Sequence, residues 1–201
     1  MMSAEPLSRY ACPFEQGSLR LVEGFLNENT SNKYFYELLA GNHWNNARYK
    51  VGGREFVMPR VQTWYADPGI LYNFSYKLHN QRDWTPALKH LRQSIETFSG
   101  HSFNSVLINY YRDGQDRVDW HSDNERELGA QPMIASLSLG ADRNFYYKNK
   151  RTAEQGSVLL TKGSLLLMYP EFQHQWLHSI PVDKALTRSR INLTFRKVIM
   201  P

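Results

Sequence analysis

The stretch Arg190-Ile191-Asn192-Leu193-Thr194-Phe195-Arg196 alternates polar and apolar side chains over its whole length. Successive side chains of a β-strand point to opposite faces, so this segment would present one polar and one apolar face. Two interpretations are open: the polar face meets solvent at a sheet edge, or it lines the bore of a barrel and binds an anion there. In the second case the planar guanidinium of Arg190 would hold a carboxylate through two parallel hydrogen bonds.

Six other short segments with the composition of strands come before this one and are separated by Gly, Asp, Lys-Gly or Pro turns. They comprise residues 105–111, 133–139, 144–148, 157–161, 164–169 and 176–180. Such a series is typical of a β-sandwich or jelly roll. We therefore predict a mainly β protein with flanking helices, of the α+β class, whose jelly-roll core occupies residues 100–199.

Two helices are predicted in the N-terminal half. The first begins at an N-cap, Ser31, and ends at Gly41. The second begins at Thr85, has Pro86 in its first position and ends at Gly100.

Strands are predicted in the same half at residues 19–22 and 70–76. Gly52-Gly53 precedes residues 54–65, which we interpret as a hairpin. Its second arm contains Pro59 and is therefore expected at a sheet edge.

Composition limits the class of protein. The 201 residues contain no repeat, linker or low-complexity tract, so a single domain over residues 1–201 is predicted. One cysteine excludes an intrachain disulfide and favours an intracellular location, cytoplasmic or, in a eukaryote, nuclear. The chain shows no membrane-spanning apolar run and no signal-peptide pattern, and we expect a monomer without a membrane partner. A net charge of +5 suits a polyanionic partner.

His121 and Asp123 are two residues apart. In an extended chain their side chains would lie side by side, as two of the three ligands that non-heme Fe(II) oxygenases use. The alternative is a loop in which both are solvated or locally hydrogen-bonded. Two later histidines could complete the set. We expect His178, which alternates with bulky apolar residues, rather than His174, which lies in a polar run typical of a loop.

Asn109 and Tyr111 are also two residues apart on a predicted strand. They could add hydrogen bonds to the acid held by Arg190. A metal beside a dicarboxylate pocket is the arrangement of a 2-oxoglutarate site.

Four motifs together resemble the AlkB family of Fe(II)/2-oxoglutarate-dependent dioxygenases. In chain order they are Asn109-Tyr110-Tyr111, His121-Ser122-Asp123, His178-Ser179-Ile180-Pro181 and Arg190-Ile191-Asn192-Leu193-Thr194-Phe195-Arg196. Their order and spacing make a chance match very improbable. The resemblance extends over roughly residues 55–198.

This resemblance implies a double-stranded β-helix that demethylates N-alkylated bases, of the 1-methyladenine and 3-methylcytosine type, in DNA or RNA. It implies Fe(II), 2-oxoglutarate and O2: the co-substrate is oxidised to succinate and CO2, and the methyl group is hydroxylated and leaves as formaldehyde. By the same resemblance the metal ligands are His121, Asp123 and His178. The matching co-substrate contacts are Asn109, Tyr111, Arg190, Asn192 and Arg196.

The resemblance also implies how substrate is presented. A base must be flipped out of a duplex or offered from a single strand. It would stack between His121 and Phe74, with Tyr72 as the alternative contact, although both aromatics could equally be core residues. Glu125 would approach the base edge, unless it is a solvated loop charge.

Residues 43–76 match the substrate-recognition lid of the family. This segment is basic and aromatic, and within it Tyr49 is a candidate substrate contact. Arg54 and Arg60 are expected to reach phosphates. Where relatives that repair duplexes have a bulky apolar wedge, this chain has Val51-Gly52-Gly53, so single strands are expected to be preferred.

Two other functions are consistent with parts of the pattern. One is a non-catalytic module that binds modified bases, which would lack a metal ligand or the co-substrate arginine; neither is missing. The other is a dioxygenase of the same chemistry acting on methylated protein or lipid, against which the basic lid argues.

Overall fold

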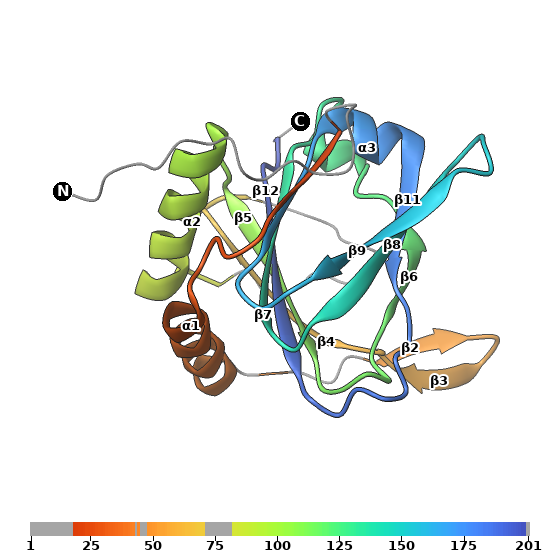
Figure 1. Cartoon of the computed structure of the whole chain (residues 1–201), viewed down its shortest axis with the longest axis horizontal. Helices are drawn as coiled ribbons and strands as arrows, with labels where there is room; N and C mark the ends of the chain where they lie inside the picture. Colours follow the sequence, from red (N-terminus) through yellow and green to blue (C-terminus); the bar gives the residue numbers. More distant parts are fainter. Residues whose placement is uncertain (1–17, 43, 45–47, 71–81, 200–201) are drawn as a thin grey trace.

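A computed structural model describes residues 18–42, 44, 48–70 and 82–199 of the chain (Figure 1). In this part, two antiparallel sheets face each other, with strand orders β1-β10-β7-β12-β5-β4 and β6-β11-β8-β9, and β2 and β3 form a separate hairpin. The strands are β1 (Leu19–Val22), β2 (Arg48–Val51), β3 (Arg54–Val57), β4 (Val61–Ala66), β5 (Ser105–Tyr111), β6 (Val118–His121), β7 (Ile134–Gly140), β8 (Arg143–Asn149), β9 (Gln155–Leu160), β10 (Leu165–Met168), β11 (Trp176–Ile180) and β12 (Arg190–Arg196). The predicted jelly-roll core is confirmed.

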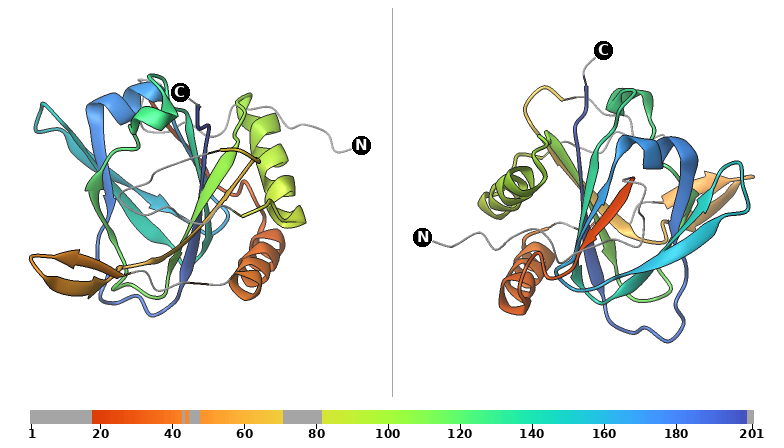
Figure 2. Two further views of the ribbon diagram at one scale, coloured as in Figure 1. Left: turned by 180° about the vertical axis from the view of Figure 1, so that it is seen from behind. Right: turned by 45° about the horizontal axis from the view of Figure 1, so that its top comes forward.

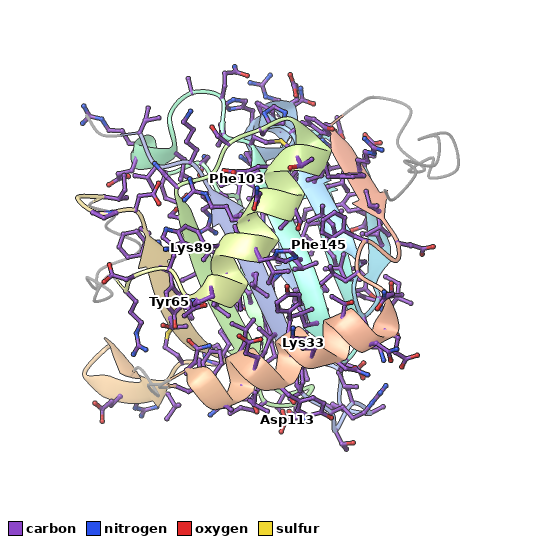
Figure 3. The ribbon with its side chains drawn as sticks, turned by 90° about the vertical axis from the view of Figure 1, so that its left-hand side faces the viewer. Lys33, Tyr65, Lys89, Phe103, Asp113 and Phe145 are labelled. Carbon is purple, nitrogen blue, oxygen red and sulfur yellow. The ribbon has the colours of Figure 1, made fainter. Side chains whose placement is uncertain are left out.

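Helices α1 (Glu28–Gly41) and α2 (Pro86–Ser99) lie over the outer face of the six-stranded sheet (Figure 3). The four-stranded sheet and the β2–β3 hairpin lie on the side away from these helices (Figure 2). The apolar face of β12, with Ile191, Leu193 and Phe195, is fully buried in the cluster that includes Leu88 and Leu91 of α2. The other face of β12 therefore points between the two sheets.

This orientation decides between the two interpretations of β12. Arg190 and Arg196 are only 1% and 3% exposed, and Asn192 and Thr194 are also buried. The strand is central, since it pairs with β5 on one side and with β7 on the other. Its polar face lines the interior, and the solvent-facing alternative is wrong.

The second helix was predicted closely, but the first begins earlier than expected. Thr85 caps α2, and Gly100 ends it in the left-handed conformation, with φ 72°. Asn27 caps α1 by accepting from the backbone N–H of Thr30. Ser31 lies inside that helix and is buried, so its prediction as the N-cap was wrong.

The predicted hairpin over residues 54–65 was also wrong. Gly52-Gly53 is itself the turn, and it joins β2 to β3. Both glycines have positive φ, 55° and 78°, as a tight two-residue turn requires. The chain then breaks at Pro59, and β4 joins the edge of the six-stranded sheet beside β5.

The predicted lid, residues 43–76, is described only in part. Its described portion consists mainly of the β2–β3 hairpin and β4, and β4 belongs to the sheet rather than to a separate cover. The predicted strand at residues 70–76 lies outside the described residues except for its first position. Among the helices of the described part, none has the length and apolar character needed to span a membrane.

Candidate metal and co-substrate site

The pairing of β6 with β11 brings the predicted metal ligands together. His121 and His178 are directly opposite in the register of these strands, and their ring centroids are 4.2 Å apart. Strand β6 ends at His121, and Asp123 follows in a bend. One ligating atom from each of the three residues lies within 4.8 Å of the other two. His174, by contrast, lies in α3 (Pro170–Gln175), where a loop was predicted, and its Nε2 is bonded to the carbonyl of Ala130.

The carboxyl group of Asp123 is buried and charged. Arg196 donates from Nη2 to its Oδ1 at 2.8 Å, and both side chains are almost inaccessible. Burial alone would raise the pKa of Asp123, but the Arg196 guanidinium, together with the two imidazoles when these are protonated at acidic pH, lowers this pKa to about 2. Arg196, predicted as a co-substrate contact, therefore lies against the metal-ligand cluster.

The two imidazoles are in the form that binds a metal. Burial lowers the pKa of both rings, that of His178 to about 3. His121 Nδ1 lies 2.8 Å from the carbonyl oxygen of Asp119 and must donate to it, so Nε2 carries the lone pair. That Nε2 faces Asp123 Oδ1 at 3.8 Å. Two neutral imidazoles and one carboxylate on one side of a pocket fit Fe(II).

Arg190 lies at the other end of the same pocket, which the metal-ligand cluster also lines. Its Nη2 donates to Ser138 Oγ at 2.9 Å, and the guanidinium stacks over the ring of Tyr111 at 5.2 Å. Nε and Nη1 are buried without a hydrogen-bond partner among the described residues. Burial lowers the pKa of Arg190 to about 10, with the Tyr111 phenol acting in the opposite direction, so the side chain is cationic at neutral pH. Buried N–H groups are nearly always paired, so these two fit a carboxylate ligand.

Asn109 and Asn192 join four strands in one polar network between the two ends. Asn109 Oδ1 accepts from Arg60 Nε and from Gln62 Nε2, at 2.9 and 2.7 Å. Asn192 donates to Ser136 Oγ at 2.8 Å and accepts from Thr194 Oγ1 at 2.9 Å. These contacts fix the polar side chains that line the pocket.

Comparisons with known proteins agree with this geometry. The model of the 2OG-Fe(II) oxygenase superfamily matches residues 18–196. DNA oxidative demethylase ALKBH2 of Mus musculus is 39% identical over 161 residues, which cover 76% of this chain and 67% of that protein. The chain belongs to the AlkB family. Alpha-ketoglutarate-dependent dioxygenase alkB homolog 3 of Homo sapiens is 35% identical over 191 residues, 89% of this chain and 65% of that protein.

This AlkB-family chain thus spans about two thirds of the length of those relatives, 67% and 65%. A solved structure described as "The structure of OsALKBH1" superposes with a TM-score of 0.65 and covers 94% of this chain and 100% of that one. Its sequence is only 16% identical, so this likeness concerns the fold alone.

The structure brings fewer of the predicted substrate contacts of the AlkB-family chain to the pocket than of its predicted metal ligands and co-substrate contacts. Arg60 lines the pocket beside Asn109, whereas Arg54 is exposed at the start of β3. Glu125 is partly buried at the N-cap of a 3-10 turn and is not among the described residues that line the pocket. Phe74 and Tyr72 lie outside the described residues, as does the side chain of Tyr49 on β2.

Several residues of the site were missed from the sequence. Ser136 and Ser138 alternate with apolar residues in β7, which was an available signal that they share one face, and in the β7–β12 register they lie opposite Thr194 and Asn192. Gln62 sits opposite Asn109 in the β4–β5 register. The contact of Gln173 with Asp123 is between residues 50 apart and has no local signal.

Proposed function

We propose that this chain is an Fe(II)/2-oxoglutarate-dependent dioxygenase that demethylates N-alkylated bases in DNA or RNA and releases formaldehyde, succinate and CO2. One observation carries the proposal: a single pocket is lined by the His121, Asp123 and His178 cluster and by the buried Arg190. The names of the relatives, a DNA oxidative demethylase and an alpha-ketoglutarate-dependent dioxygenase, support the substrate and the co-substrate.

The three residues of the cluster would hold the metal on one side. When bound, Fe(II) with 2-oxoglutarate and O2 supplies the oxidation of the methyl carbon. The chain supplies a carboxylate kept ionised by Arg196 and an imidazole whose tautomer is set by the Asp119 carbonyl. These contacts orient the ligands before any metal binds.

The co-substrate would extend from the metal towards Arg190. Its far carboxylate would accept from the two unpartnered nitrogens of Arg190, with the Tyr111 ring packed against the guanidinium. Asn109 and Asn192, fixed by the polar network, would offer their amides along the way. Leu107, Phe145 and Ile180 belong to the apolar part of the wall and would exclude water from the reacting atoms.

Substrate would enter on the side of His121, whose side chain is 32% exposed while Asp123 is buried. A base flipped from its strand could stack on this ring. Arg60, at the pocket wall, is a cation that could meet a phosphate or the base.

The test is mass spectrometry of oligonucleotides carrying 1-methyladenine or 3-methylcytosine, incubated with Fe(II), 2-oxoglutarate and O2. We expect the loss of one methyl group and stoichiometric succinate. Succinate formation with methylated peptides but not with oligonucleotides would overturn the substrate assignment while leaving the dioxygenase assignment intact.

We also expect single strands to be turned over faster than duplexes. The β2–β3 turn consists of Gly52 and Gly53, which are exposed and have open space around them, so the tip of the hairpin bears no side chain to fill the gap left by a flipped base. Extruding a base costs a few kcal/mol, so kcat/KM for a duplex should be lower by at least about tenfold. Matched single and double strands with the same lesion check this, and equal or faster duplex turnover would contradict it.

A further inference from the structure

Helix α3 touches two of the three proposed metal ligands. Phe172 packs against the His178 ring, with centroids 5.9 Å apart. The next residue, Gln173, is completely buried, and its Oε1 accepts from the backbone N–H of Asp123 at 2.9 Å. One short helix thus contacts His178 through a ring and Asp123 through an amide.

The hydrogen bond from the Asp123 backbone N–H to Gln173 takes the place of a hydrogen bond between strands. Strand β6 ends at His121, so the backbone of Asp123 lies beyond the ladder to β11. Asp123 is 1% exposed, and its N–H would be left buried without a partner if Gln173 were absent. Arg196 fixes the carboxylate of Asp123, and Gln173 fixes its main chain.

The Gln173 side chain is itself held in place. Its Nε2 donates to Met168 Sδ at 3.5 Å, and its backbone carbonyl accepts from Lys150 Nζ at 2.7 Å. The same ammonium donates to Ser122 Oγ at 3.0 Å, immediately before Asp123. Residues 122 and 123 are therefore joined to α3 by two independent hydrogen-bonded links.

We propose that Gln173 is a positioning residue for the metal site, which holds the main chain of Asp123 so that its carboxylate faces His121 and His178. This rests on the proposed function, because it assumes that these three residues bind the metal. Groups that orient metal ligands typically contribute ten- to a hundredfold to metal affinity. Gln173 would act in this way without touching the metal.

The experiment measures Co(II) binding by the full chain, from the visible absorption of the bound metal. Gln173→Leu keeps the shape but removes the acceptor, and we expect the affinity to fall about ten- to a hundredfold with a changed absorption spectrum. Gln173→Glu keeps an acceptor oxygen at the same place and is expected to bind nearly as well as the unaltered chain. Gln175→Leu is the matched control, since Gln175 is exposed on the same helix, and it should leave affinity unchanged.

Unaltered affinity in Gln173→Leu would overturn the inference, as would equal losses in the leucine and glutamate variants. If Gln173→Leu does not fold, Gln173→Asn, whose amide is one methylene too short to reach Asp123, decides in the same way. Asp123→Ala separates the two proposals. If that variant binds Co(II) as well as the unaltered chain, the proposed metal site fails and the inference with it; if it does not bind, a failure of the Gln173 series concerns Gln173 alone.

Discussion

Asp123→Asn is expected to abolish turnover, with a loss on the order of a thousandfold or more, because metal catalysis contributes several kcal/mol. The carboxylate is the only anion of the three proposed ligands, and an amide in its place is neutral. The change also leaves the buried guanidinium of Arg196 without the carboxylate it bonds at 2.8 Å. Removing one partner of a buried pair costs about 3–5 kcal/mol, so thermal unfolding of the metal-free chain should shift to lower temperature.

The control is Asp119→Asn, the same substitution four residues earlier. The Asp119 side chain is 84% exposed, and His121 depends on its backbone carbonyl rather than its carboxylate. Turnover should therefore stay near that of the unaltered chain. The double variant Asp123→Asn, Arg196→Met should recover part of the stability without recovering Co(II) binding. Asp123→Asn that turns over within about tenfold of the unaltered chain would contradict the metal assignment.

The site was predictable where it depends on strand periodicity. Alternation in residues 176–180 was enough to point His178 inward, and β11 has the predicted bounds. Strand β5, which carries Asn109 and Tyr111, also has the predicted bounds. On β12, periodicity gave a polar and an apolar face but could not tell that both are buried, because the polar face is covered by a second sheet that no local pattern places.

Other features depend on contacts that no local pattern records. Gln173 meets Asp123 across 50 residues of sequence, and α3 that carries it is too short for a helical periodicity. The hairpin was misplaced because a glycine pair can precede a strand or form the turn itself, and only the β2–β3 register decides. The resemblance assigned Arg196, like Arg190, to the co-substrate, and only the structure shows that Arg196 lies against Asp123, six residues along β12 from Arg190.

That separation gives Arg190 a prediction of its own: Arg190→Met should lose 2-oxoglutarate binding while making the ligand-free chain no less stable. Removing the buried arginine that pairs with a ligand carboxylate costs about 2–5 kcal/mol of binding free energy, which corresponds to roughly 30- to 5,000-fold in Kd. Without ligand, however, Arg190 is a buried cation, two of whose nitrogens have no hydrogen-bond partner in the part of the chain that the structure describes. Burial lowers its pKa from the ordinary value of arginine to about 10, so the unfolded chain binds the proton more tightly than the folded chain does. The charge therefore opposes folding at every pH below about 10, and an apolar side chain of similar length removes this cost.

Two measurements, both with Mn(II) present, check the prediction. Calorimetric titration with 2-oxoglutarate measures the loss of binding, and thermal unfolding measures the stability of the chain. 2-Oxoglutarate should raise the unfolding temperature of the unaltered chain and leave that of Arg190→Met unchanged, because a ligand stabilises only the state that binds it. Arg188→Met is the matched control, since Arg188 is exposed two residues away and should behave like the unaltered chain in both assays. Arg190→Lys keeps the charge without the fork and should bind with intermediate affinity. Full affinity for 2-oxoglutarate in Arg190→Met would show that the far carboxylate is held elsewhere. Strong destabilisation of the ligand-free variant would show that the guanidinium stabilises the fold, which would contradict the second half of the prediction.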